Sequence, residues 1–127
     1  MLRGLESSAM FAKIVVVPGS DDPEQAVMRR VRQVAAESAE IEVFDVAYEP
    51  LLESYLGNKA VYEPLRRRVV DERRARAESL AHALGTGGRK ASGRALWDHP
   101  RHRVIADEVR STHADLLVTA PQHGPGP

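Results

Sequence analysis

The chain has 127 residues, of which 43% are hydrophobic and 28% charged, with 18 basic side chains against 18 acidic ones and no cysteine. This length accommodates one domain. The balanced charge argues against a general nucleic-acid or membrane-surface binder, and the lack of cysteine excludes disulfides, thiolate catalysis and cysteine-ligated metals. No apolar run approaches the ~20 residues of a membrane span, and residues 1–10 lack the apolar middle of a signal peptide. We therefore expect a cytoplasmic protein with neither a nucleic-acid nor a membrane partner, in which residues 1–10 are a disordered lead and residues 11–127 form a single domain.

The first regular segment is a nearly continuous β-branched run, Ala12–Val17, which predicts a strand covered on both faces. In the loop that follows, Asp22 is placed as a helix N-cap and Pro23 at the first helical position. The predicted helix spans about residues 23–38, and its apolar stripe consists of Val27, Val31, Val34 and Ala35.

Residues 40–47 alternate between apolar and polar side chains, which predicts a second strand that is less fully covered than the first. The alternation places Ile41, Val43 and, near its end, Asp45 on one side. Residues 48–63 form a long connection that holds all three tyrosines, and we expect it to pack against the body of the domain. Connections of this length are often functional.

The second half of the chain continues the alternation of helices and strands. Pro64 is placed to open the longest helix, which ends near Gly85. A weaker strand over 91–97, a short helix over 100–112 and a fourth strand over 115–120, buried by its composition, follow. This order predicts an α/β fold of three layers, with a mostly parallel sheet of four strands and helices on both faces. Ligands of such sheets bind outside the carboxyl ends of the strands, where the loops 18–22, 46–50 and 120–127 would meet.

The order and spacing of several segments resemble the universal stress protein family over nearly all of residues 11–124. The segments are the strand at 13–17 with its Pro-Gly-Ser-Asp-Asp loop, the long arginine-rich helix, and the stretches at 96–100, 104–109 and 113–118. Residues 96–100 (Leu-Trp-Asp-His-Pro) and 121–123 (Pro-Gln-His) look most like the first domain of the tandem-domain E branch. The resemblance implies a Rossmann-like, adenine nucleotide alpha hydrolase-like sheet of five parallel strands, dimerisation, stress-linked expression and, in one branch only, ATP binding.

In the ATP-binding branch, an Asp precedes Gly-Ser after the first strand, and a glycine-rich loop follows the fourth. Here Gly19-Ser20 matches, but Pro18 stands in place of the Asp, and Pro121 stands in place of the first loop glycine. Proline has no N–H to donate and cannot adopt a positive φ, so these departures argue against ATP binding of the family type. If a nucleotide binds, the resemblance implies that its contacts are Pro18, Gly19, Ser20, Asp21, Val46, Gln122, His123 and Gly124.

The sequence ends where the family places its fifth strand. The fourth strand would then present an exposed edge, which is a template for pairing with another chain. We therefore expect a homodimer, or a second tandem domain, as the partner.

Other candidate residues have two interpretations each. The loop 18–22 is either an anion cradle or an ordinary strand-to-helix turn. Its two adjacent aspartates would repel a phosphate unless a Mg²⁺ ion were bound between them. Arg73 falls on the otherwise apolar stripe of the long helix, where its stem covers apolar surface with its head in water or its fork binds a carboxylate or phosphate. Trp97 either lines a pocket or anchors the core. His99 and His102 are three residues apart, but His99 precedes Pro100 and is expected to lie before the helix, so we predict no metal site.

No nucleophile and base are spaced as a catalytic site requires, and we predict no catalytic residues. The sequence therefore favours a non-enzymatic stress-response or regulatory module that acts through dimerisation or ligand sensing. The alternatives are a universal stress protein that binds ATP and a small nucleotide-using α/β enzyme such as an ATP pyrophosphatase, whose Ser-Gly-Gly-x-Asp-Ser loop is not matched here.

Overall fold

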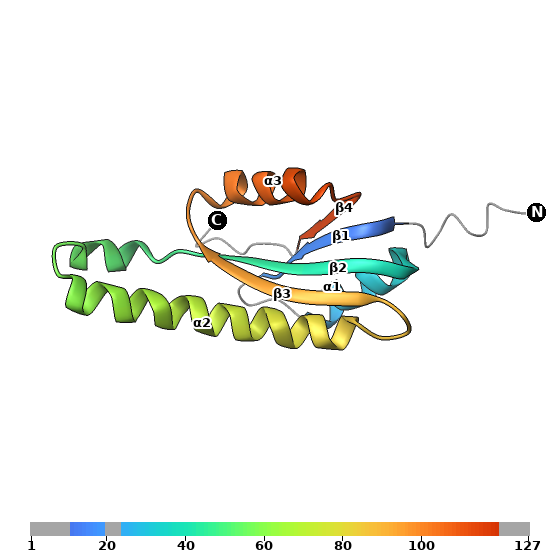
Figure 1. The fold of residues 1–127 in the computed structure, drawn as a ribbon, viewed down its shortest axis with the longest axis horizontal. Helices are drawn as coiled ribbons and strands as arrows, with labels where there is room; N and C mark the ends of the chain where they lie inside the picture. Colours follow the sequence, from blue (N-terminus) through green and yellow to red (C-terminus); the bar gives the residue numbers. More distant parts are fainter. Residues whose placement is uncertain (1–10, 20–23, 120–127) are drawn as a thin grey trace, which may run out of the picture.

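The computed structural model describes residues 11–19 and 24–119, which form a four-stranded parallel sheet with helices on both faces (Figure 1). The strands lie in the order β3-β2-β1-β4 and are β1 (Phe11–Val17), β2 (Ala35–Ala47), β3 (Lys90–Trp97) and β4 (Leu116–Thr119). The helices are α1 (Glu24–Val34), α2 (Lys59–Leu84) and α3 (Arg101–Thr112), and a 3₁₀ helix, η2 (Pro50–Tyr55), precedes α2. The predicted α/β class, strand order along the chain and parallel sheet are confirmed.

Strand β1 is central and pairs with β2 on one side and β4 on the other. Asp115 fixes the start of β4, because its Oδ2 accepts hydrogen bonds from the backbone N–H groups of Ala12 (3.1 Å) and Lys13 (3.0 Å). Its own N–H donates to the Lys13 carbonyl at 2.8 Å. These bonds hold β4 in register, so the carboxyl ends of all four strands meet at one edge of the sheet.

Two apolar cores lie on opposite faces of the sheet, since successive side chains of a strand alternate between faces. Helices α1 and α2 cover one face, and α3 covers the other (Figure 1). The complete burial of Ile14–Val17 confirms the prediction of a strand covered on both faces. The α1 and α2 side contains Ile14, Val16, Ile41, Val43, Val31, Leu80 and Leu84, and the α3 side contains Val15, Val17, Phe44, Val46, Val104 and Ile105.

The prediction for β2 is wrong in two respects. The strand is buried from Ile41 to Ala47, more fully than the alternation indicates, because it lies between β1 and β3 with helices on both faces. It also begins at Ala35 rather than at residue 40, and α1 ends at Val34 rather than at residue 38. Ala35 pairs with Phe11, and Arg89 donates to the Ala35 carbonyl (3.3 Å), so partners distant in sequence hold this stretch extended.

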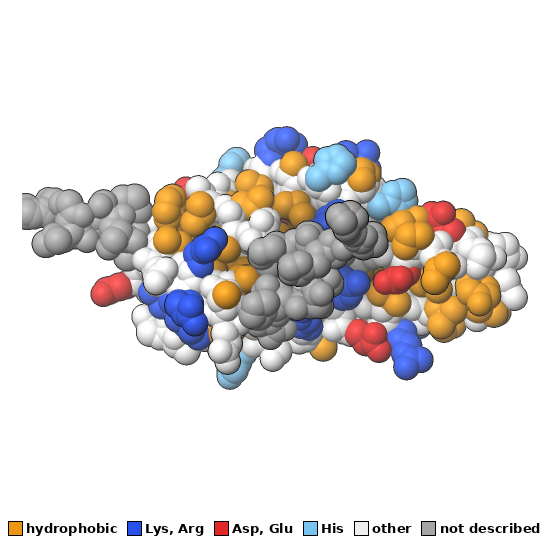
Figure 2. All heavy atoms as spheres, turned by 180° about the vertical axis from the view of Figure 1, so that it is seen from behind, with side chains coloured by type: hydrophobic (Ala, Val, Ile, Leu, Met, Phe, Trp, Pro, Cys, Tyr) orange, Lys and Arg blue, Asp and Glu red, His pale blue; other side chains and the backbone are white. Residues whose placement is uncertain are grey.

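The prediction that Pro64 opens the long helix is also wrong, because α2 begins at Lys59. The carbonyl of Asn58 accepts hydrogen bonds from the N–H groups of Val61 and Tyr62, which starts the helix earlier. Pro64 lies inside α2 at an exposed position, where water can replace the missing backbone hydrogen bond. Helix η2 and the start of α2 project beyond the carboxyl ends of the sheet (Figure 1). Exposed hydrophobic side chains gather on this projection (Figure 2), among them Leu51 and Leu56.

The expectation that the fourth strand is buried holds only for Val118. Leu117 is 38% exposed and Thr119 is exposed, because within the described residues β4 pairs only with β1. The predicted lead at 1–10, the cap at Asp22 and Pro23, and the loop at 120–127 lie outside the described residues. Among the helices of the described part, none combines the length and apolar character needed to cross a membrane.

Candidate functional site

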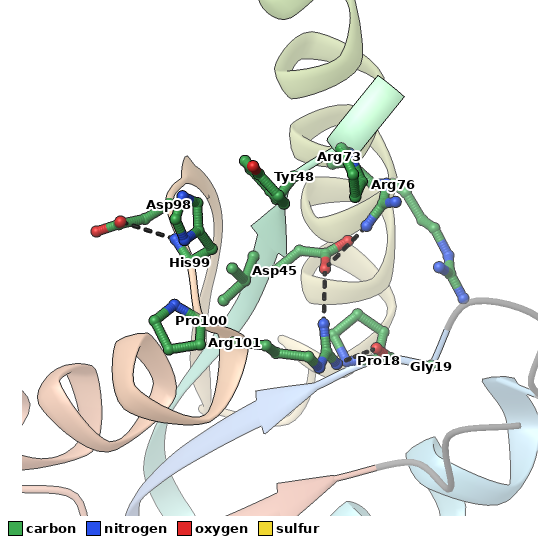
Figure 3. A pocket seen from close by; sticks show the side chains of 12 residues that line it. Pro18, Gly19, Asp45, Tyr48, Arg73, Arg76, Asp98, His99, Pro100 and Arg101 are labelled. Carbon is green, nitrogen blue, oxygen red and sulfur yellow. Dashed lines mark hydrogen bonds and ion pairs between the residues drawn. The ribbon is translucent and has the colours of Figure 1, made fainter. Parts of the chain in front are cut away.

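A pocket of about 350 Å³ opens at the carboxyl ends of β1, β2 and β3 (Figure 3). Three strand ends contribute to it because the strands are parallel, and α2 and the first residue of α3 close it from the sides. This is the edge at which ligands of α/β sheets bind. Its lining consists of Pro18, Gly19, Asp45, Val46, Tyr48, Pro50, Arg73, Arg76, Asp98, His99, Pro100 and Arg101.

Asp45 is the buried charge of this pocket, with 2% of its surface exposed. Its Oδ1 lies 3.5 Å from Arg73 Nη1 and 4.0 Å from Arg101 Nη1 (Figure 3). Its Oδ2 has no hydrogen-bond partner among residues 11–19 and 24–119. Burial raises the pKa of the Asp45 carboxyl, and the nearby positive charges of Arg73, Arg101 and Arg76 offset this only in part.

Arg73 and Arg101 approach Asp45 from different elements. Arg73 comes from α2 and also lies 3.8 Å from Glu49 Oε2, so the interpretation in which its fork binds a carboxylate is confirmed. Arg101 is the first residue of α3, and its Nη2 donates to the Pro18 carbonyl at 3.4 Å. Arg101 therefore spans the ends of β1 and β2, and its burial lowers the pKa of its guanidinium.

An aromatic group forms the wall of the pocket near β3. The rings of Tyr48 and His99 have centroids 4.2 Å apart, and those of Tyr48 and Trp97 are 5.5 Å apart. Trp97 also makes an edge contact with Tyr62 of α2 and is absent from the pocket lining. Trp97 is therefore an anchor that supports the wall, which agrees with the second interpretation of this residue.

The sequence and the fold were compared with those of known proteins. The sequence matches the universal stress protein family over residues 10–125. The chain belongs to the universal stress protein family. A comparison with curated proteins finds no significant match.

Solved structures share the fold of this universal stress protein domain. The hypothetical protein MJ0577 superposes with a TM-score of 0.68 at 15% identity, covering 86% of this chain and 74% of that one. The universal stress protein UspA from Lactobacillus plantarum gives a TM-score of 0.62 at 15% identity, covering 92% of this chain and 82% of that one. Rv1636 from Mycobacterium tuberculosis gives 0.50 at 16% identity, covering 88% and 72%. At these identities, the likeness concerns the fold alone.

Three of the residues expected to contact a nucleotide in a universal stress protein line the pocket: Pro18, Gly19 and Val46. The other five, Ser20, Asp21, Gln122, His123 and Gly124, lie outside the described residues. His99 lies before α3, as predicted, so it and His102 do not share a helical face. The described part of the chain contains no group of three or more His, Asp or Glu side chains that could hold a metal ion.

Sequence reasoning missed Asp45, Arg76 and Arg101 as pocket residues, whereas Tyr48 lies in the predicted loop 46–50 but was not singled out. The only sequence signal for Asp45 was its place on the apolar side of the second strand, where a carboxylate needs a partner. Arg101 carried no such signal, because it looks like any charged residue at the start of a helix. Only the fold brings it to the end of β1.

A second group of charged residues lies away from this pocket, between the sheet and α3. Glu42 of β2 and Glu108 of α3 are both buried, and Arg94 Nη1 lies 2.6 Å from Glu108 Oε2 and 3.7 Å from Glu42 Oε2. These three residues border a shallow hollow of about 410 Å³ near the amino-terminal parts of β2 and β3.

Proposed function

We propose that this universal stress protein domain is a non-enzymatic regulatory module that senses a small ligand at the carboxyl ends of β1, β2 and β3. One observation carries the proposal. The buried Asp45 carboxyl lines the pocket, and its Oδ2 has no donor in the described structure. An unsatisfied buried oxygen costs free energy, so a ligand or water that donates a hydrogen bond there would be bound favourably.

The chemistry of the lining supports binding rather than catalysis. The hydroxyl of Tyr48 is hydrogen-bonded to Glu53, and Asp98 Oδ1 accepts the backbone N–H of His99 at 2.7 Å rather than orienting a ring nitrogen. Within the described lining, no nucleophile is therefore paired with a base in the way that nucleophilic catalysis requires.

ATP is the disfavoured ligand in this proposal. Pro18 offers no N–H, and its carbonyl accepts the Arg101 side chain, which lies across the strand ends where the family resemblance implies nucleotide contacts. The alternative of an ATP-binding domain remains testable with the same protein.

Thermal and urea unfolding with a panel of metabolites, including ATP–Mg²⁺, tests the function. A sensed ligand at 100 times its Kd should raise the free energy of unfolding by about 2.7 kcal/mol, and ATP–Mg²⁺ at millimolar concentration should give no shift. Arg101→Gln should reduce the ligand-dependent shift, whereas Arg110→Gln, an exposed residue of the same helix paired with Asp107, should leave it unchanged. Stabilisation by ATP–Mg²⁺, or turnover of nucleotide that Ser20→Ala abolishes, would contradict the proposal.

We also propose that the domain works with a partner, either a second copy or the second domain of a tandem protein of the E branch. The open edge of β4 and the 38% exposed Leu117 support this within the described residues. The E-branch assignment rests on the sequence resemblance of residues 96–100 and 121–123, and Asp98, His99 and Pro100 of the first stretch line the pocket. Size-exclusion chromatography with light scattering should show a dimer that Leu117→Lys weakens, and a wild-type monomer at all concentrations would exclude the homodimer.

A further inference from the structure

The pocket lining is richer in guanidinium groups than in carboxylates. Arg73, Arg76 and Arg101 line it together with Asp45 and Asp98. Asp98 is exposed at the rim and already accepts a hydrogen bond. The first backbone N–H groups of α3 begin at Arg101 and add partial positive charge at the same edge. The interior of the pocket therefore favours an anionic group.

The arginines retain the capacity to bind such a group. Arg73 lies 3.5 Å from Asp45 and 3.8 Å from Glu49, and Arg101 lies 4.0 Å from Asp45 and 3.4 Å from the Pro18 carbonyl. Charge-assisted hydrogen bonds are typically about 2.7–2.9 Å long. A phosphate between the guanidinium groups of Arg73 and Arg101 can accept shorter hydrogen bonds than their present protein partners do. The planar guanidinium group also matches the geometry of a phosphate.

Asp45 favours a second kind of group on the same ligand, a hydrogen-bond donor. Its Oδ2 is buried and lacks a donor in the described structure, so a ligand that supplies a hydrogen there gains a hydrogen bond that the protein itself does not make. A cationic donor would be repelled by the three guanidinium groups of the lining. A neutral donor, for which a hydroxyl is the simplest choice, satisfies the oxygen without that repulsion.

We infer that the pocket binds a small phosphorylated polyol or sugar, with its phosphate on the arginines and a hydroxyl donating to Asp45. This inference rests on the proposed ligand-sensing function and names the class of ligand. The volume of about 350 Å³ lies at the lower end of the range of ligand pockets, roughly 300–1,000 Å³. It suits a compact ligand of this kind.

The test measures binding by calorimetry to two probes, glycerol 3-phosphate and ribose 5-phosphate. Propyl phosphate keeps the phosphate without free hydroxyls, glycerol and ribose keep the hydroxyls without the phosphate, and ATP–Mg²⁺ represents nucleotides. Wild-type protein should bind at least one of the two probes about tenfold more tightly than the analogue that lacks either group, since a hydrogen bond to a charged group is worth about 1.5–3 kcal/mol. Amide chemical shifts of Gly19 and Val46 should move on binding, which localises the ligand to the pocket.

Two variants separate the two halves of the site. Asp45→Asn should reduce the preference for glycerol 3-phosphate over propyl phosphate, because the neutral amide oxygen accepts a weaker hydrogen bond than the carboxylate. Arg101→Gln should weaken the binding of both phosphate compounds about tenfold and leave the ratio of their two affinities unchanged. Arg110→Gln is the matched control on α3, and its affinities should equal those of wild type. If Asp45→Asn does not fold, two other measurements decide whether both groups of the ligand are recognised. The wild-type affinities for glycerol 3-phosphate and propyl phosphate test the hydroxyl, and Arg101→Gln tests the phosphate.

The outcomes distinguish this inference from the proposed function. Equal binding of glycerol 3-phosphate and propyl phosphate by wild type would overturn the role of Asp45, as would a crystal of the complex showing only a water on Oδ2. If neither phosphorylated probe binds while another metabolite stabilises the wild type through Arg101, the ligand class is wrong and the sensing function stands. If no compound of the panel stabilises the protein, both fail.

Discussion

Glu42 of β2 and Glu108 of α3 meet in the interface between the sheet and the helix, where a protonated Glu42 carboxyl can donate a hydrogen bond to Glu108. Arg94 bridges them and also lies over the ring of Phe44, at 5.4 Å from its centroid. One guanidinium cannot neutralise two buried carboxylates. Burial, followed by the facing Glu108, therefore raises the pKa of Glu42 to about 7, against the smaller opposing effects of Arg94 and Lys13.

The first prediction concerns the pH dependence of folding. A carboxyl whose pKa is raised in the folded state favours folding while it is protonated. Its stabilising effect is therefore complete below the unfolded value of 4.5, is lost as the pH rises to about 7, and changes no further above that. The loss is on the order of 3 kcal/mol, because each pKa unit corresponds to about 1.4 kcal/mol. Glu42→Gln should remove most of this fall and be more stable than wild type at pH 8, as measured by urea unfolding at pH 4.5–8.

Glu40→Gln is the control for this prediction. Glu40 lies on the same strand, is exposed and pairs with Lys13 at 3.3 Å, so the wild-type pH dependence should persist in this variant. Burial also raises the pKa of Asp45, and a residual fall of the same sign should remain in Glu42→Gln. If Glu42→Gln keeps the full wild-type slope, the carboxyl pair does not share a proton in the folded protein.

A second prediction concerns the contact between β3 and α2. A Cβ atom on Gly93 would lie 2.4 Å from the backbone N of Glu78 and 2.5 Å from the carbonyl carbon of Ala77. Backbone atoms of a helix cannot move aside as the end of a side chain can. Gly93→Ala should therefore reduce the free energy of unfolding by about 3 kcal/mol or more, the upper end of overpacking costs.

Gly57→Ala provides the comparison for Gly93, because no atom lies within 4 Å of a Cβ at that position. Its effect should stay within about 0.5 kcal/mol, as is usual for surface substitutions. Both variants are measured by chemical denaturation. Equal, small effects would show that β3 and α2 do not approach each other this closely in solution.

The elements of the fold were predictable where their signals are local. The β-branched run of β1 and the three- and four-residue spacing around Val31 depend only on neighbouring residues. The strand is confirmed, and the helical stripe is confirmed for Val27, Val31 and Val34 but not for Ala35, which begins β2. The coverage of β2 was not predictable, because the alternation of a strand does not reveal how many neighbours it has in the sheet. The start of α2 was missed because Pro64 is a strong helix signal, whereas the Asn58 carbonyl that starts the helix carries none in the sequence.

The candidate site was predictable only at its strand ends. The rule that ligands bind at the carboxyl ends of parallel strands predicted the loops 18–22 and 46–50, and within them the family resemblance singled out Pro18, Gly19 and Val46, which line the pocket. The charges that define the chemistry of the pocket come from α2 and α3. Helical spacing singled out Arg73, but its pairing with Asp45 depends on how α2 crosses the sheet, which no local pattern encodes.

A third prediction concerns the end of α3. His113 caps this helix in the left-handed conformation, with φ 57° and ψ 43°, which favours glycine over residues that carry a Cβ. His113→Gly should therefore raise the free energy of unfolding by about 0.5–1 kcal/mol, because the relief of left-handed strain, roughly 1–2 kcal/mol, exceeds the entropy that glycine adds to the unfolded chain. His102→Gly, at an exposed position within α3, should lower it by a similar amount. Chemical denaturation gives both values, and destabilisation by both variants would contradict the left-handed cap.

The last prediction distinguishes a ligand-binding role of Asp45 from a structural one. Burial raises the pKa of Asp45 despite the surrounding arginines, so the ionised carboxyl carries a cost in stability that a neutral amide does not carry. Asp45→Asn should therefore be at least as stable as wild type at pH 7, by urea unfolding. Arg73→Gln should instead lose roughly 1–2 kcal/mol, because it leaves the buried carboxylate less compensated while Arg101 remains beside it.

Arg74→Gln is the control for Arg73→Gln, since Arg74 is the next residue of α2 and pairs with Asp71 in the solvent. Its effect should stay below about 1 kcal/mol, as for exposed ion pairs. A large loss of stability in Asp45→Asn would mean that Asp45 has a structural role, in which its ion pairs stabilise the fold by more than the burial of its charge costs. A stable Asp45→Asn would mean that folding does not need the buried charge, as a ligand-binding role of this carboxylate predicts.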